Sequence, residues 1–333
     1  MKTEKPALET DKEPSTAHPR ETFAFFGHEP EEQALADGLR NGRMHHAWLL
    51  AGTKGLGKAT LAYRFARAAL GARKDGGRPL DVDPEDVVAR RITALSHPDL
   101  FVLRRGLNDR GKPRREITVD DARELGHFFS LAPSEGGMRV AIIDAVDDLN
   151  RNAANAILKT LEEPPARSVL LLVCHAPGAI LPTIRSRCRR LALRPQSDDV
   201  VRIAMSANAD EAIVTLAKGR PGRAIAYAAQ GVDAKFADVR RAQTALQRGE
   251  AGAMLSALYD KMSGEPFEKL AGVLELAGEW TRAAGVEEGG ESWAEAWSAL
   301  ETLRGESEGL DMDPRHALAR ASGILDRAGS ARR

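Results

Sequence analysis

The sequence predicts an α/β protein with a parallel sheet covered by helices, followed by a region that is entirely helical. Between residues 21 and 194, short apolar runs alternate with segments whose apolar residues recur every three or four positions. This is the pattern of strands alternating with helices in a parallel sheet. From Ser197 onward, amphipathic segments rich in Ala, Leu, Glu and Arg follow one another without a convincing strand. A length of 333 residues suits two or three domains.

The elements are expected in the following order. Residues 1–20 are polar and without periodicity, so we expect a flexible N-terminal tail. Pro30 suits the first turn of a helix and Gly42 its end, and Pro164-Pro165 closes another helix. Apolar spacing predicts helices over 30–41, 58–70, 119–131 and 150–161, and strands over 47–51, 100–103, 139–144 and 169–174.

Composition excludes several classes of protein. The 48 Lys and Arg residues balance 48 Asp and Glu residues, so no global positive field would hold DNA unaided. The longest apolar run, Val169 to Cys174, is far shorter than the ~20 residues of a membrane span. With no apolar secretory core near the N-terminus, we expect a cytoplasmic protein without a membrane partner. Cys174 and Cys188, the two cysteines, exclude a disulfide framework and a four-cysteine zinc module.

A phosphate-binding loop is predicted between the strand at 47–51 and the helix at 58–70. Glycines let backbone N–H groups converge on phosphate oxygens, and a lysine adds a point charge. Ala59 stands where Ser or Thr would bind magnesium, and Thr60 lies about 100° further around the helix. We therefore expect ATP or ADP with Mg²⁺ to bind weakly or vestigially; the alternative is a glycine turn with a solvated lysine. The candidate nucleotide-binding residues here are Gly52, Thr53, Lys54, Gly55, Leu56, Gly57, Lys58, Ala59 and Thr60.

A second acidic position ends the strand at 139–144. Asp144 can hold magnesium through water in this class of site. Ala145 follows it, where an ATP-hydrolysing relative would carry a glutamate, and a methyl group cannot accept a proton. Asp147 and Asp148 are expected to face solvent or to cap the helix that starts near Asn150. The sequence thus predicts little or no intrinsic ATP hydrolysis.

Short motifs spread along the α/β region carry a family resemblance. They are His45–Leu49, His97–Asp99, Ile143–Ala145, Asn152–Ala156, Leu158–Pro165 and Ser186–Cys188. In this order they resemble the clamp-loader branch of the AAA+ ATPases, and within it the delta-prime subunits of bacterial DNA polymerase III. The last two motifs are the most specific.

The resemblance implies three domains and a place in a ring. They are an AAA+ P-loop core over 21–194, a small helical lid over 195–245 and a C-terminal helical collar for oligomerisation over 246–333. Such subunits form a five-membered ring with gamma/tau and delta subunits, which loads a sliding clamp onto primer-template DNA for the DNA-directed DNA polymerase, a nucleotidyltransferase. The alternatives are an ATP-hydrolysing gamma/tau-like motor of the same ring and a small-molecule kinase.

The resemblance also implies site roles. Arg187 would be an arginine finger that reaches the nucleotide of the neighbouring motor subunit, and Arg223 would begin the sensor-2 helix. The alternative for Arg187 is a solvated residue beside an edge strand. Many relatives carry a four-cysteine zinc module, but residues 71–96 contain no cysteine, so zinc is not expected. No metal-ligating residues are predicted apart from Asp144, which could hold the Mg²⁺ of a nucleotide through water. Cys174-His175-Ala176 stands where motors place a polar γ-phosphate sensor, so sensing is expected to be degraded.

Overall fold

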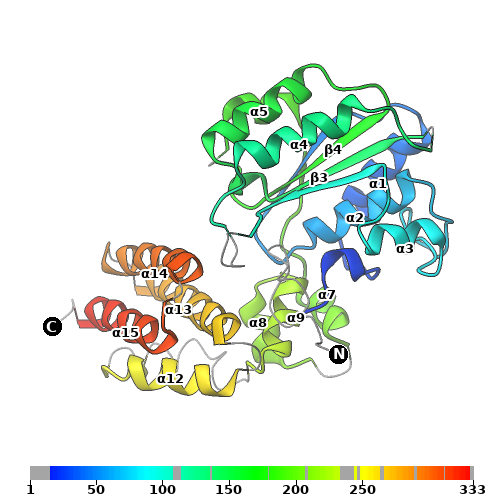
Figure 1. Cartoon of the computed structure of the whole chain (residues 1–333). Coiled ribbons are helices and arrows are strands. Elements are labelled where there is room, and N and C mark those ends of the chain that lie inside the picture. The colour runs from blue at the N-terminus through cyan, green and yellow to red at the C-terminus, as the bar shows by residue number, and fades with distance from the viewer. Residues whose placement is uncertain are drawn as a thin grey trace, which may run out of the picture. The chain divides into compact units, whose positions relative to one another are not determined.

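The structure is a computed structural model that forms two compact units, divided between Gln196 and Ser197 (Figure 1). The predicted boundaries at 194/195 and 245/246 stay predictions. The residues described are 16–107, 114–135, 137–178, 180–206, 209–232, 244–245, 248–262, 266–288, 291–310 and 312–330.

The N-terminal unit is built on a five-stranded parallel sheet, which confirms the predicted fold class. The strands lie in the order β2-β3-β4-β1-β5. Residues in β1, β3 and β4 are buried throughout, as in a sheet covered on both faces. The strands are β1 (Ala47–Ala51), β2 (Leu100–Arg104), β3 (Arg139–Asp144), β4 (Ser168–Cys174) and β5 (Arg189–Ala192).

Helices cover both faces of this sheet (Figure 1). Side chains alternate along a strand, so Trp48 faces one layer and Leu49 the other. The first layer contains α1 and α2, with Leu35 and Phe65 in its core, and the second contains α4, α5 and α6. The helices are α1 (Glu29–Arg40), α2 (Lys58–Ala69), α3 (Val87–Thr93), α4 (Val119–Ser130), α5 (Arg151–Glu162) and α6 (Pro182–Arg187).

Two segments differ from the sequence-based expectations. Between α2 and α4 the sequence predicted only the strand at 100–103, but this stretch also contains α3, which Asp86 caps by accepting the N–H groups of Val88 and Ala89. The predicted tail over 1–20 extends too far at its C-terminal end. His18 is fully buried and residues Pro19–Glu21 form a 3₁₀ helix, η1. Residues 1–15 lie outside the described residues.

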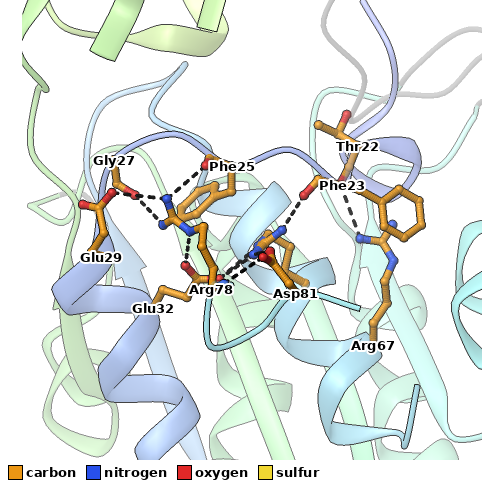
Figure 2. Close-up of polar contacts among 10 residues, drawn as sticks. Thr22, Phe23, Phe25, Gly27, Glu29, Glu32, Arg67, Arg78 and Asp81 are labelled. Atoms are coloured by element: carbon orange, nitrogen blue, oxygen red, sulfur yellow. Dashed lines mark hydrogen bonds and ion pairs between the residues drawn. The ribbon is translucent and has the colours of Figure 1, made fainter. Parts of the chain in front are cut away.

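Buried arginines hold residues 20–27, here called the strap, against α2. The Nη1 of Arg64 donates to the carbonyl of Phe23. Arg67, which is fully buried, donates to the carbonyl of Thr22 at 3.4 Å and lies 3.9 Å from the centre of the Phe23 ring (Figure 2). A guanidinium suits this role because its planar donors satisfy several carbonyls while its face contacts an aromatic ring.

Arg78 holds the other end of the strap. It donates to the carbonyl of Phe25 at 3.2 Å and to that of Gly27 at 2.7 Å, and its Nε lies 2.6 Å from Glu32 Oε2 (Figure 2). The Phe25 ring lies directly on the glycine before α2: a Cβ added to Gly57 would stand 3.0 Å from Phe25 Cε2. The strap therefore fixes one wall of the predicted phosphate loop.

The C-terminal unit consists of helices in its described part. A single cluster of buried apolar side chains runs from Val201 to Ala328 and includes Trp280 and Trp293. The described helices lack the combination of length and apolarity that a bilayer span needs. They are α7 (Asp198–Met205), α8 (Glu211–Ala217), α9 (Pro221–Ala229), α12 (Ala251–Lys261), α13 (Pro266–Glu288), α14 (Glu291–Leu310) and α15 (Pro314–Ser330).

Candidate nucleotide site and arginine finger

The predicted phosphate loop lies between β1 and α2. Gly55 and Gly57 have φ of 86° and 83°, a left-handed backbone that favours glycine. A Cβ on Gly52 would meet the carbonyl oxygen of Leu193 at 2.5 Å. Gly57 begins α2, and among the described residues no side chain caps this helix. Its first-turn N–H groups are therefore available to an anion.

Lys58 is buried inside the loop rather than solvated, so the simple glycine-turn alternative is wrong for this side chain. It is 3% exposed, and its Nζ donates to the carbonyls of Gly52 and Thr53, both at 2.7 Å. Burial lowers its pKa from 10.5 to about 8, against the opposing effect of nearby carboxylates, chiefly Asp144. The ammonium is therefore held by two carbonyls of its own loop.

Asp144 ends β3, at the same edge of the sheet as the loop. It pairs in register with Val173 of β4, whose neighbour Cys174 pairs with Ala51 at the end of β1. Asp144 is 8% exposed and Ala145 is 3% exposed. The structure thus brings together the lysine and the carboxylate that the sequence nominated, and it places a methyl group beside them.

Asp147 has a structural role that the sequence analysis missed. Its carboxylate accepts the backbone N–H of His175 at 2.6 Å and that of Ala176 at 2.8 Å. The helix cap expected of it comes instead from Asn150, whose side chain accepts the N–H of Ala153. Asp147 therefore ties the loop after β3 to the loop after β4.

Asp148 also departs from the expectation of a solvent-facing or capping residue. Its Oδ2 lies 3.3 Å from the Nε of Arg105. Burial raises the pKa of this carboxyl, and the charge of Arg105 opposes the change. This ion pair links the segment after β3 to the residue that follows β2.

His175 stands at the predicted γ-phosphate sensor position. Burial, and then nearby positive charges of which Lys58 is the strongest, lower its pKa to about 2. A neutral imidazole has one N–H donor and one acceptor nitrogen, so the side chain adds no charge beside the loop. Burial also raises the pKa of both Cys174 and Cys188 to about 12, and the two are free thiols.

Arg187 lies at the protein surface, at the last position of α6. Its side chain is 33% exposed, and its Nη2 lies 2.6 Å from Glu162 Oε1 at the end of α5. Its Nη1 donates to the carbonyl of Thr183 at 2.9 Å. Arg189 and Arg190, on the edge strand β5, are also exposed. The N-terminal unit therefore presents arginines along α6 and β5.

Arg223 belongs to the helical unit, whereas the phosphate loop belongs to the N-terminal unit. It is 5% exposed, forms an ion pair with Glu275 of α13 and lies 5.2 Å over the Tyr227 ring. The sensor-2 role of Arg223 stays a prediction. The described residues contain no group of three or more His, Cys, Asp or Glu side chains able to hold a metal ion.

Comparison with known proteins identifies the family. The model for the family described as "DNA polymerase III, delta subunit" matches residues 27–197, about half of the chain. A Pseudomonas aeruginosa DNA polymerase III subunit delta' is 38% identical over 160 residues, which are 48% of this chain and 46% of that protein. The chain thus spans about half the length of that relative.

Tau subunits of DNA polymerase III are similar over a smaller share of their length. The tau subunit from Salmonella typhimurium is 34% identical over 183 residues, which are 55% of this chain and 27% of that protein. A DNA polymerase III gamma subunit-related protein from Thermotoga maritima shares the fold, with a TM-score of 0.50 at 15% identity over 90% of this chain and 99% of that one. The match to the family model and the similarity to delta' subunits show that the chain belongs to the DNA polymerase III delta-prime subunit family of clamp-loader AAA+ proteins.

Proposed function

We propose that this chain is a non-hydrolysing clamp-loader subunit that donates Arg187 to the nucleotide of a neighbouring ATPase subunit. The observation that carries the proposal is that the Arg187 side chain reaches the surface of the N-terminal unit. The same unit has Ala59 where a magnesium ligand would stand and Ala145 where a catalytic glutamate would stand. Its partners would be gamma/tau and delta subunits in a five-membered cytoplasmic ring. With them it would place a sliding clamp on primer-template DNA.

The chain's own loop fits a phosphate better than it fits magnesium. Positive-φ glycines, an uncapped helix start and Lys58 suit phosphate oxygens. Lys58 must first leave two carbonyl acceptors, which lowers the affinity for a nucleotide. Ala59 has no hydroxyl for Mg²⁺, which leaves Asp144 as the carboxylate of the site. We propose that ATP or ADP binds weakly here, as a structural ligand that is not hydrolysed.

The chemistry proposed for Arg187 is stabilisation of charge in trans. Bound ATP with Mg²⁺ in the neighbour supplies a γ-phosphoryl group on which negative charge redistributes during hydrolysis. The Arg187 guanidinium remains charged at any physiological pH, and its planar donors match phosphate oxygens. Arginines in this role contribute about 10³–10⁵-fold to the rate. This chain would therefore control hydrolysis without performing it.

The test is single-turnover ATP hydrolysis by a ring reconstituted from this chain and its motor and delta partners. Arg187→Ala should slow ATP hydrolysis at the motor site that adjoins this chain by about 10³-fold or more. The amplitude of the single-turnover burst should therefore fall by the share that this site contributes. Arg185→Ala is the matched control, because Arg185 is exposed on the same helix. An unchanged burst with Arg187→Ala would contradict the finger assignment.

The competing motor function is tested on the isolated chain. Its similarity to the tau subunit, at 34% identity, is the observation that favours this alternative. Because Ala145 cannot polarise water, we expect no hydrolysis above that of the Lys58→Ala variant. Turnover at the rate of the motor subunits, abolished by Lys58→Ala, would support the motor function instead.

A further inference from the structure

The guanidinium of Arg187 is held in place by a carboxylate of its own chain. Glu162 is the last residue of α5, and Glu163 and the prolines at 164 and 165 follow it, so the helix ends at this point. Its Oε1 lies 2.6 Å from Arg187 Nη2, with the two side chains 49% and 33% exposed. The end of α5 thus places one fixed acceptor beside the end of α6.

Two further contacts hold the same side chain from within α6. Arg187 Nη1 donates to the carbonyl of Thr183 at 2.9 Å and lies 3.5 Å from Ser186 Oγ. A guanidinium carries five N–H donors. These contacts and the ion pair with Glu162 occupy at most three of them, so Arg187 is oriented while donors remain for an incoming anion.

We propose that Glu162 is a positioning residue that orders Arg187 for its contact with the neighbouring nucleotide; this inference rests on the proposed function. Arginine is rich in rotamers, and ordering such a side chain during docking opposes association. Ordering by Glu162 takes place before docking. Exposed ion pairs contribute little to folding stability, so the effect of Glu162 should appear in the action of Arg187 rather than in the fold.

The matched control is Glu163, exposed at the next position. Glu163→Gln removes the same charge at the same end of α5 but leaves the Glu162 carboxylate paired with Arg187. If the acidic end of α5 acted only through its charge, Glu162→Gln and Glu163→Gln would change the rate of ATP hydrolysis at the adjoining motor site by the same factor. If Glu162 instead held Arg187 back from the neighbouring nucleotide, Glu162→Gln would hydrolyse ATP at that site faster than the wild type.

The first experiment uses the isolated chain and needs no hydrolysis. The ¹⁵N relaxation of the Nε–H group of Arg187, assigned with Arg187→Lys, reports the order of this side chain. Glu162→Gln should increase its motion on the picosecond-to-nanosecond timescale, and Glu163→Gln should leave it as in the wild type. Unchanged order in Glu162→Gln would overturn the proposal.

The second experiment is a double-mutant cycle in the reconstituted ring. Glu162→Gln should lower kcat at the adjoining motor site by about three- to tenfold, the range for ordering one long side chain, with unchanged ATP affinity. It should have no further effect in the Arg187→Ala background. If Arg187→Ala slows hydrolysis but Glu162→Gln matches Glu163→Gln or exceeds the wild type, positioning is wrong and the finger stands. If Arg187→Ala has no effect, the proposed function and this inference both fail.

Discussion

The buried ammonium of Lys58 makes a quantitative prediction for stability against pH. Its pKa is lowered from 10.5 to about 8 in the folded chain, chiefly by burial. Folding therefore carries a free-energy cost for burying the charged ammonium. This cost is fully present below about pH 8, where Lys58 is charged in both states, and it disappears as the pH rises to 10.5 and the side chain becomes neutral. At about 1.4 kcal/mol per pH unit, the penalty is about 3 kcal/mol. The free energy of unfolding of the wild type, relative to Lys58→Met, should rise by about this amount between pH 7 and 10.5.

The measurement must report on the N-terminal unit alone. Of the four tryptophans, only Trp48 lies in that unit, so its ¹⁹F resonance in 5-fluorotryptophan-labelled protein follows urea unfolding there. The difference between wild type and Lys58→Met cancels the titration of every other group. A difference that is constant within about 0.5 kcal/mol over this range would mean that Lys58 titrates alike in both states, which would refute its burial against the loop carbonyls.

The remaining predictions concern the walls of the site. Asp147→Ala leaves two backbone N–H groups after β4 without their charged acceptor and should destabilise the N-terminal unit by about 2–4 kcal/mol. Amide hydrogen exchange in the loop after β4 should become faster. Unchanged exchange there would contradict the role of Asp147. Gly57→Ala strains a left-handed backbone and contacts Phe25, so it should cost about 1–2 kcal/mol from backbone strain alone, measured by the ¹⁹F signal. Gly71→Ala, at a positive φ with open space around it, isolates the backbone strain, and an equal loss in both variants would argue against the Phe25 contact.

Features with a local signature were predictable from the sequence. Apolar runs alternating with helical periodicity predicted the parallel sheet, and strand pairing confirms it. The glycine spacing before Lys58 predicted a glycine-rich turn between a strand and a helix, and in that turn Gly55 and Gly57 have a left-handed backbone. In each case, residues within a few positions of one another determine the conformation.

Features that depend on distant partners were not predictable in this way. Asp147 bonds to the N–H groups of residues 175 and 176, far along the chain, and no local pattern distinguishes it from a helix cap. The ion pair between Glu162 and Arg187 depends likewise on how α5 and α6 meet. The short helix α3 did have a local signal, because Asp86 is a suitable N-cap, but the charged, Pro- and Gly-rich surroundings obscured it.

The affinity of the ring for a transition-state analogue reports directly on whether Arg187 acts on the neighbouring nucleotide. ADP with aluminium fluoride resembles the transferring γ-phosphoryl group, and an arginine finger acts mainly on that state. Arg187→Ala should weaken retention of the analogue at the adjoining motor site by about 10³-fold or more, while binding of ADP alone stays unchanged. Equal retention of the analogue by wild-type and Arg187→Ala rings would contradict the claim that this chain acts on its neighbour's nucleotide through Arg187.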